Sequence, residues 1–315
     1  MGNSLYGRDC LSLQDYTAEE IRSVLDLAIK LKEKQKKGDA HPLLAGKTLG
    51  MIFQKASTRT RVSFEVGIWQ LGGIALFLSS QELQMGRGEP ICDTAAVLSR
   101  YVDGIMIRTF EQSEVEELAA YASVPVINGL TDILHPCQSL ADLMTIEEKL
   151  GCLQGVKLAY LGDGNNVAHS LMIACSKMGM DITVATPEKY RPTPLFEALA
   201  RENALKSGSC IQITSDPLEA VKDASIIYTD AWASMGQEEE KNIRKEIFKP
   251  YQVNSRIVKA APSGALIMHC LPAYRGEEIT DDVLDGDCSI VIDQAENRLH
   301  AQKGLMALLM RKDAL

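Results

Sequence analysis

Short apolar runs and stretches of helical hydrophobic spacing follow one another along the chain. Residues 49–53 form an apolar run of strand length, and apolar side chains then recur at helical spacing between Val62 and Trp69. These patterns predict a buried strand followed, after a polar turn, by a helix. The pattern repeats downstream, and we expect strands near residues 73–78, 104–107 and 124–127 and helices near residues 91–102, 113–123 and 139–150.

A helix is also predicted before the first strand. Thr17 and Glu20 have the spacing of a capping box, in which each side chain accepts a hydrogen bond from the other residue's backbone N–H. Gly38 is of the residue type that most often ends a helix. Between them the apolar residues fall on one helical face: Ile21, Val24, Leu25, Ala28 and Leu31.

The alternation of strands and helices restarts after a glycine-containing turn at residues 151–155. We expect strands near residues 156–161, 182–185, 211–214, 225–229, 265–268 and 290–292. Such alternation is typical of parallel sheets covered by helices on both faces. The chain is therefore predicted to be an α/β protein with two Rossmann-like domains, residues 1–150 and 151–294, and a C-terminal helix (residues 295–315) that packs back on the first domain.

Composition narrows the function classes. The 315 residues are 46 % hydrophobic, enough for roughly two domains. A formal net charge of −9 without a sustained basic run argues against nucleic acid or an anionic membrane as partner. No apolar run spans a membrane and the first ten residues lack signal-peptide features, so we expect a cytoplasmic protein. The eight cysteines form no C-x-x-C pair, and we predict neither a metal site nor a disulfide framework.

The polar turn after the first strand has the chemistry of an anion site. Ser57 lies near a helix start, where backbone N–H groups lack intrahelical partners and the helix dipole is positive. Thr58 and Thr60 add hydroxyl groups, and Arg59 adds a planar fork of N–H groups that matches phosphate oxygens. A phosphate site is favoured, although a serine cap followed by two solvated arginines accounts for the same residues.

Other polar residues also follow strands, where parallel sheets bind their ligands. Arg108 follows the strand at 104–107, and His135 and Gln138 come after the strand near 124–127. Asp230 follows the strand at 225–229 and is suited to hold an amino group, unless the turn is an ordinary polar one. Cys270 follows the strand at 265–268, where a thiolate can help to deprotonate an amine, unless it is only a small buried residue.

A dinucleotide-binding turn is suggested by Gly-Asp-Gly-Asn-Asn at residues 162–166, but its fingerprint is incomplete. Val167 occupies the position of the third glycine, and no acidic residue ends the strand at 182–185. A nicotinamide-dependent dehydrogenase is therefore disfavoured, and we predict no cofactor. Asn165 and Asn166 instead place amide donors at a helix start, where a substrate carboxylate can bind.

Together these strings resemble the ornithine carbamoyltransferases over roughly residues 47–300. The shared strings are Ser-Thr-Arg-Thr-Arg at 57–61, His-Pro-Cys-Gln at 135–138, Gly-Asp-Gly-Asn-Asn at 162–166, Ser-Met-Gly at 234–236, His-Cys-Leu-Pro at 269–272 and Glu-Asn-Arg-Leu-His at 296–300. The last string is expected to begin the C-terminal helix.

The resemblance implies a set of site residues. Carbamoyl phosphate is expected on Ser57, Thr58, Arg59, Thr60, Arg108, His135 and Gln138, with Cys270, Leu271 and Arg298 completing the site. L-Ornithine is expected on Asn166, Asp230, Ser234 and Met235. The catalytic roles fall to Arg108, His135, Asp230 and Cys270. Family members are built on trimers with sites at subunit interfaces, and Gln84 is the residue expected to enter a neighbour's site.

The implied reaction is direct attack of the ornithine side-chain amine on carbamoyl phosphate, which gives citrulline and phosphate through a tetrahedral intermediate. Relatives that use putrescine lack Ser-Met-Gly, those that use aspartate also lack His-Cys-Leu-Pro, and acetylornithine or succinylornithine enzymes depart within Ser-Thr-Arg-Thr. A silent phosphate-binding Rossmann-like protein is expected to have lost Arg108, His135, Asp230 or Cys270, and all four are present. The direction, towards arginine or in its breakdown, stays open.

Overall fold

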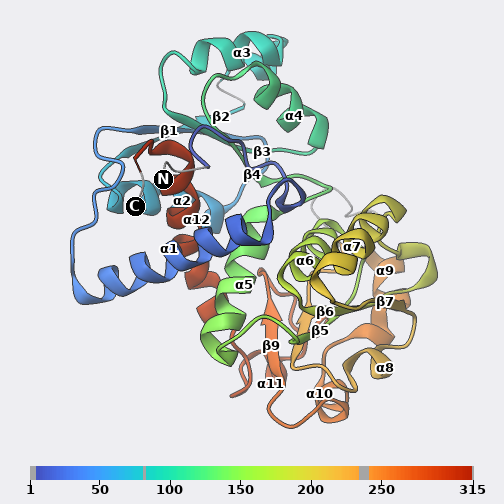
Figure 1. Ribbon diagram of the computed structural model, residues 1–315. Helices are drawn as coiled ribbons and strands as arrows, with labels where there is room; N and C mark the ends of the chain where they lie inside the picture. The colour runs from blue at the N-terminus through green and yellow to red at the C-terminus, as the bar shows by residue number, and fades with distance from the viewer. Residues whose placement is uncertain (1–4, 81–82, 234–240, 314–315) are drawn as a thin grey trace. The chain divides into compact units, whose positions relative to one another are not determined.

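Each half of the chain folds around its own parallel sheet in the computed structural model, which describes residues 5–80, 83–233 and 241–313 (Figure 1). A first unit comprises Met1–Met144 and Glu296–Leu315, and a second comprises Thr145–Ala295. The predicted α/β class with two parallel sheets is confirmed. Among the described residues, no helix is both long enough and apolar enough to cross a membrane.

The sheet of the first unit places two strand ends next to each other. Its order is β2-β1-β3-β4, with bounds Thr48–Phe53 for β1, Ile74–Ser79 for β2, Gly104–Arg108 for β3 and Val126–Leu130 for β4. The chain runs from β1 outward to β2 and then crosses to β3 on the other side, so Phe53 pairs with Arg108. A reversal of strand order of this kind opens a crevice at the carboxyl ends of the strands, where α/β proteins bind ligands.

Helices cover both faces of this sheet. Helices α3 and α4 lie together on one face, and Figure 1 shows α2 and α12 on the other. The face beneath α3 and α4 is filled by a buried cluster that includes Ile52, Ile105 and Leu118. The helices of this unit are α1 (Ala18–Lys37), α2 (Thr58–Gln70), α3 (Ile91–Leu98) and α4 (Gln112–Tyr121), with the first part of α5 (Pro136–Leu150), most of α12 (Val291–Met310) and the short η1 (Leu13–Asp15) and η2 (Gln84–Arg87).

The capping box predicted for the first helix is confirmed. Glu20 N donates to Thr17 Oγ1 at 3.2 Å, and Thr17 N donates to Glu20 Oε2 at 2.9 Å. Gly38 ends the helix at φ 76°, in the left-handed region that glycine adopts without steric cost.

The C-terminal helix α12 packs on the first unit, as predicted. Small residues allow this contact, because a Cβ at Gly304 would lie 2.7 Å from the carbonyl oxygen of Val24 in α1. A Cβ at Gly67 in α2 would lie 3.1 Å from the Met306 side chain of α12. Such close approach brings the polar residues of α12 into the interior of the unit, which matters for Arg298 below.

The second unit repeats the reversal of strand order. Its sheet has the order β7-β6-β5-β8-β9, with bounds Lys157–Leu161 for β5, Asp181–Ala185 for β6, Ile211–Thr214 for β7, Ile226–Thr229 for β8 and Leu266–His269 for β9. Leu161 pairs with Thr229, which in turn pairs with His269. Three strands therefore end side by side, just before Gly162, Asp230 and Cys270.

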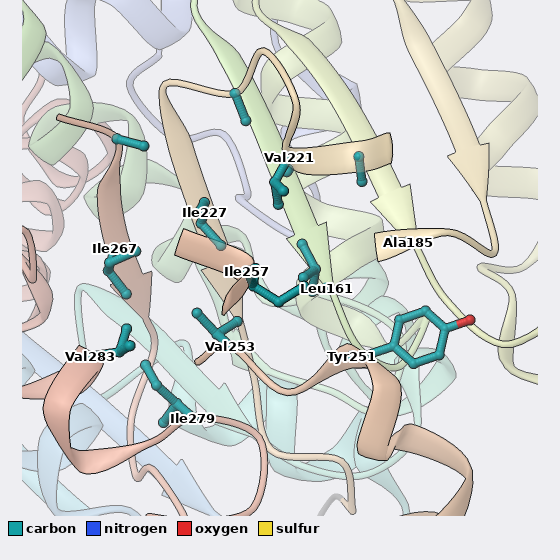
Figure 2. Packing of buried hydrophobic residues seen from close by; sticks show 14 of the residues in the cluster. Leu161, Ala185, Val221, Ile227, Tyr251, Val253, Ile257, Ile267, Ile279 and Val283 are labelled. Atoms are coloured by element: carbon teal, nitrogen blue, oxygen red, sulfur yellow. The ribbon is translucent and has the colours of Figure 1, made fainter. Parts of the chain in front are cut away.

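A continuous apolar core lies against one face of the second sheet. Figure 2 shows Leu161, Ile227 and Ile267 from three neighbouring strands in one cluster with Val221 and Ile257. The helices of this unit are α6 (Asn166–Met178), α7 (Pro194–Ser207), α8 (Pro217–Val221), α9 (Lys241–Phe248), α10 (Ser255–Ala260) and α11 (Asp281–Leu284), with η3 (Glu188–Tyr190) and η5 (Lys249–Tyr251).

The strand predicted at residues 290–292 is wrong. Ser289 forms only an isolated bridge to Ile267, and the helix α12 begins at Val291, where Gln294 N donates to the carbonyl oxygen of Ile290. A short run of β-branched residues cannot be assigned to strand or helix from periodicity alone. Because Ile292 is 73 % exposed, the run is also not a buried strand.

Helix boundaries differ from the predictions by a few residues. Helix α12 starts at Val291 instead of residue 295, so Arg298 lies in its second turn and not in its first. Helix α5 begins at Pro136, which leaves His135 directly before it. Helix α3 ends at Leu98, because the chain turns there and Val102 N donates to the Leu98 carbonyl at 3.0 Å.

Candidate active site

The helix α2 begins at the predicted anion turn, with Ser57 as its N-cap. Ser57 has extended backbone angles, and its hydroxyl accepts a hydrogen bond from Thr60 N at 3.2 Å and donates to Thr60 Oγ1 at 3.1 Å. The remaining backbone N–H groups of the first turn are oriented along the axis of a 13-residue helix. This arrangement provides backbone donors and a positive dipole end for an anion.

Thr60 is the point at which residues from three further elements converge. Its side-chain oxygen lies 3.4 Å from Arg108 Nη1 of β3 and 3.3 Å from Arg298 Nη2 of α12. Arg298 also donates through Nη1 to Gln138 Oε1 of α5 at 2.8 Å. Thr60 is 1 % exposed, and both arginines are buried. The first unit therefore holds two guanidinium groups against one hydroxyl at the end of its central strands.

His135 is buried beside these cations. Burial lowers its pKa well below the ordinary value, and the charges of Arg298, Arg108 and Arg59 lower this pKa further. The imidazole is therefore neutral at neutral pH. It can donate a hydrogen bond without adding a further positive charge to those of the arginines.

Two residues of the predicted set stand apart from this cluster. Thr58 is exposed in the first turn of α2, and Gln84 is exposed in η2. Among the described residues, no hydrogen bond connects the Gln84 side chain to Thr60 or its neighbours. Entry of Gln84 into a neighbouring subunit stays a prediction, because the structure contains a single chain.

In the second unit, Asp230 collects hydrogen-bond donors at the end of β8. Its carboxylate accepts from Cys270 Sγ at 2.9 Å, from Asn165 Nδ2 at 2.7 Å and from Ala231 N at 2.8 Å. The first two donors come from the ends of β9 and β5. The two residues proposed from sequence to act on the amine, Asp230 and Cys270, are therefore in direct contact.

Asn165 has a different role from the one predicted. It caps helix α6, because its Oδ1 accepts from Val167 N at 3.0 Å and from Ala168 N at 3.2 Å, while its Nδ2 donates to Asp230. Its amide oxygen is thus engaged in capping, and its amide nitrogen donates one hydrogen bond to Asp230. An asparagine directly before a helix is a recognised N-cap signal, and the sequence reasoning passed over it. Asn166 is the first residue of α6 and stays a predicted ligand.

The Gly-x-Gly turn has a reason that does not involve a dinucleotide. A Cβ at Gly164 would lie 2.2 Å from the backbone nitrogen of Pro192, so only glycine fits there. Between the two glycines, Asp163 forms an ion pair with Arg244 at 2.7 Å. Burial raises the pKa of Asp163, and the charge of Arg244 acts in the opposite direction. Nothing in the sequence had indicated this buried pair.

Arg244 also donates to the Trp232 carbonyl oxygen at 2.9 Å. It thereby ties the chain beyond Asp230 to the turn at residues 162–166. Ser234 and Met235, which are predicted to contact ornithine, lie outside the described residues.

Cys270 is followed by a residue with an unusual backbone. Leu271 has φ 57°, in the left-handed region that disfavours a residue with a side chain. Its backbone N–H donates to His269 Nδ1 at 2.8 Å, and His269 Nε2 lies 3.0 Å from Glu278 Oε1. The sequence had drawn attention to the His-Cys-Leu-Pro string, but gave no sign of the glutamate partner.

A metal ion has little to bind in this part of the molecule. Among the described residues, one group of metal-ligand types gathers, with ligand atoms of Asp230, His269 and Cys270 within 4.8 Å of one another. Both ring nitrogens of His269 are already engaged, by Leu271 and by Glu278. Two protein ligands are left, fewer than the three or four that zinc sites use.

Comparison with known proteins places the chain in a family. A model described as aspartate/ornithine carbamoyltransferase, carbamoyl-P binding domain, matches residues 8–148. The model described as the Asp/Orn binding domain of the same family matches residues 154–309.

Individual relatives match over nearly the whole chain. The ornithine carbamoyltransferase of Thermococcus kodakarensis is 61 % identical and covers 98 % of each chain. The anabolic ornithine carbamoyltransferase of Pyrococcus furiosus has the same identity and coverage. The solved structure of ornithine carbamoyltransferase from Pyrococcus furiosus superposes with a TM-score of 0.95 at 61 % identity, covering 98 % of each chain.

Proposed function

The chain belongs to the aspartate/ornithine carbamoyltransferase family, and on that premise we propose that it carbamoylates L-ornithine with carbamoyl phosphate. The products are L-citrulline and phosphate. One of the relatives at 61 % identity is named as anabolic, so the direction is that of arginine biosynthesis. The observation that carries the assignment is that a chain of this family has both a cationic cluster on Thr60 in its first unit and the Asp230–Cys270 contact in its second.

Carbamoyl phosphate binds at the Thr60 cluster. Its phosphate occupies the start of α2, where Ser57, Thr58 and the backbone N–H groups donate and Arg59 provides a paired contact. Its carbonyl oxygen lies towards Thr60, Arg108 and His135. Fixed donors on an oxygen that gains negative charge lower a barrier by about 3–4 kcal/mol each. A neutral His135 suits this role, since it donates without repelling the arginines.

Ornithine supplies the nucleophile through its side-chain amine. That amine is protonated at neutral pH and must lose a proton before it attacks. Asp230 accepts this proton, and Cys270, whose thiol donates to one of the Asp230 oxygens, shares in the transfer. Asn166, Ser234 and Met235 bind the rest of the amino acid, and Leu271 and Arg298 complete the contacts of the carbamoyl group.

The reaction then proceeds without a covalent enzyme intermediate. The neutral amine nitrogen forms a bond to the carbonyl carbon and gives a tetrahedral intermediate. The bond from that carbon to the phosphate oxygen breaks, phosphate leaves with the electron pair, and the second proton of the nitrogen passes to the departing phosphate. Orientation of the two reactants contributes roughly 7–11 kcal/mol.

The assembly we propose is a homotrimer or a multiple of trimers, with Gln84 reaching a neighbour's site. An exposed apolar surface on the first unit supports association. Trp69, Ile74 and Leu76 are 72 %, 58 % and 43 % exposed, and β2 is an edge strand of its sheet. Exposed apolar edge strands invite pairing with another chain. Light scattering after size exclusion is expected to give three times the chain mass, or a multiple, and Leu76→Asp to reduce it.

The function is tested by citrulline formation from carbamoyl phosphate, with ornithine, putrescine, N-acetylornithine and aspartate assayed in parallel. Turnover with ornithine alone supports the proposal. Turnover with another amine keeps the Thr60 site and replaces the ornithine assignment. Absence of turnover with every amine, together with retained carbamoyl phosphate binding, means a silent binding protein.

A further inference from the structure

A buried histidine and glutamate lie behind the Cys270 end of β9, outside the reaction described above. His269 and Glu278 are each 0 % exposed, and His269 Nε2 lies 3.0 Å from Glu278 Oε1. Because neither side chain has exposed surface within its unit, neither is placed to touch a substrate. Any influence on the reaction must pass through the residues that they hold.

The hydrogen bonds of His269 define the position of its ring proton. Nδ1 accepts from Leu271 N at 2.8 Å, so this nitrogen carries no proton. The proton therefore lies on Nε2 and is donated to Glu278. The imidazole links a buried carboxylate on one side to the backbone just after Cys270 on the other.

Glu278 holds a second point of the same segment. Its Oε1 also accepts from Tyr274 N at 2.6 Å. One carboxylate oxygen thus collects a donor from the imidazole and a donor from the backbone three residues beyond Leu271. The segment from Leu271 to Tyr274 is fixed at both ends by one buried pair.

Glu278 is itself held by the apolar core of the second unit. The Glu278 carbonyl oxygen accepts from Val253 N at 2.8 Å, and the neighbouring Ile279 is fully buried. Figure 2 shows Ile279 packed with Val253 and Val283 in the apolar cluster under the sheet. The anchor for the Cys270 segment is therefore set by core packing.

The held segment needs such an anchor, because Leu271 occupies the left-handed region at φ 57°. Conformations of this kind persist only where the surroundings over-determine them. The residue between His269 and Leu271 is Cys270, whose sulfur donates to Asp230 Oδ1 at 2.9 Å. Release of Leu271 would rotate the backbone that aims this thiol.

We propose that His269 and Glu278 are positioning residues that keep the Cys270 thiol on Asp230 by holding Leu271 in its left-handed conformation. The link to catalysis rests on the proposed carbamoylation of ornithine, whereas the link to the thiol does not. Breaking the pair should impair use of ornithine and leave the proposed phosphate contacts of carbamoyl phosphate, which lie in the first unit, unchanged.

The kinetic test compares Glu278→Met, Glu278→Gln and the control Glu277→Met. Glu278→Met lacks both acceptor bonds, and we expect kcat/KM for ornithine to fall about 10- to 100-fold, as small misplacements do. The KM for carbamoyl phosphate should stay within twofold. Glu278→Gln keeps an oxygen for both donors and should restore kcat/KM to within about threefold of wild type. Glu277 lies beside Glu278 in the chain but pairs with Lys245 of α9, and its variant should behave as wild type.

Glu278→Gln separates positioning from stability. Its amide N–H would replace Oε2, which has no hydrogen-bond partner among the described residues. Leaving a donor unpaired in that place should lower the melting temperature. If the pair acts by positioning Cys270, Glu278→Gln should have a lower melting temperature but a kcat/KM for ornithine close to that of wild type. If the pair only stabilises the fold, the melting temperature and kcat/KM should fall together.

The thiol test is independent of turnover. Alkylation of Cys270 by iodoacetamide is followed by peptide mass spectrometry, with the exposed Cys152 and Cys210 as internal references. A thiol released from Asp230 should react about fivefold faster or more in Glu278→Met, with no change at the two references. If Glu278→Met does not fold, Glu278→Asp, which is too short for both partners, takes its place.

Three results would overturn the proposal. One is an unchanged Cys270 alkylation rate in folded Glu278→Met. Another is an ornithine kcat/KM within twofold of wild type in that variant. The third is an equal loss in Glu278→Gln and Glu278→Met. If the wild type carbamoylates no amine, the proposed function fails, and the alkylation rates still decide whether the pair positions Cys270.

Discussion

At the carboxyl ends of β1 and β3 the first unit brings guanidinium groups together, whereas at the corresponding ends of β5 and β8 the second unit brings donors to a carboxylate. Both places are reversals of strand order beside a helix start. In the first, Arg108 and Arg298 point at the Thr60 hydroxyl. In the second, Asn165 and Cys270 donate to Asp230.

The difference shows how one scaffold serves two kinds of chemistry. The helix start of α2 is the proposed anion site, and Arg108 and Arg298 lie beside it. The helix start of α6 is closed by its own Asn165 cap, which then orients a carboxylate. In the proposed reaction, the first arrangement polarises an electrophile, and the second accepts a proton from a nucleophile. Substitutions in the two units should therefore change different kinetic constants.

The largest expected effect is that of Asp230→Asn. An amide cannot take the proton of the ornithine amine, so we expect kcat to fall about 1,000-fold, within the range for loss of a general base. The KM for carbamoyl phosphate should not change. Steady-state citrulline assays measure both constants. Asp216→Asn is the control, because this residue only caps α8 and asparagine caps equally well. A rise in the KM of Asp230→Asn for carbamoyl phosphate would contradict the assignment of the two substrates to different units.

The next effect is that of Arg59→Ala. A guanidinium that makes charged hydrogen bonds to phosphate contributes about 1.5–3 kcal/mol per bond, so the KM for carbamoyl phosphate should rise about 100-fold. The matched control is Arg61→Ala, two residues further along α2. Arg61 pairs with Glu65 at 2.9 Å and lies over the Phe77 ring, away from Thr60. Wild-type affinity for carbamoyl phosphate in Arg59→Ala would remove the phosphate site from the start of α2.

Cys270→Ser sharpens the comparison within the second unit. A serine hydroxyl can still donate to Asp230, but it is a far weaker acid than a thiol and cannot share in proton transfer at neutral pH. We expect kcat to fall about 30-fold, less than a full general-base loss. Carbamoyl phosphate binding, measured by calorimetry, should be retained. Unchanged turnover would show that the thiol has no part in the mechanism and that Asp230 acts without it.

Local features of both sites could be predicted from sequence because they depend on neighbouring residues. The Ser57 cap is an example, since a hydroxyl before a helix bonds to an N–H three residues on. The positions of Arg108 and Asp230 also followed from the rule that parallel strands end at the same edge. Sequence patterns of this range therefore predict which polar residues directly follow each strand.

Contacts across long sequence separations could not be predicted in the same way. Arg298 meets Thr60 only because α12 packs closely on α2 and α1, which depends on Gly67 and Gly304. The sequence predicts Arg298 near the start of the C-terminal helix but does not indicate its partners. The family resemblance implied that Arg298 belongs to the carbamoyl phosphate site, and the packing of α12 explains how it reaches Thr60.

The two buried pairs of the second site, His269–Glu278 and Asp163–Arg244, could not be predicted from neighbouring residues in the sequence either. Glu278 follows His269 by nine residues within a loop, and Arg244 lies far from Asp163 along the chain. Charged residues in such segments are normally solvated, so burial of both members is visible only once the fold is known.

The smallest predicted effect concerns His135, where the charges of the first unit act on stability. Its folded pKa lies below the unfolded value, so the unfolded chain binds more protons between the two values. His135 therefore contributes stability above its unfolded pKa that is lost as pH falls towards the folded pKa. Against His135→Gln, which does not titrate, wild type should lose about 1 kcal/mol of unfolding free energy between pH 7 and 5.5, measured by urea denaturation. A parallel pH dependence of the two proteins would mean that His135 is not held neutral, and that the first unit adds a cation where the mechanism needs a neutral donor.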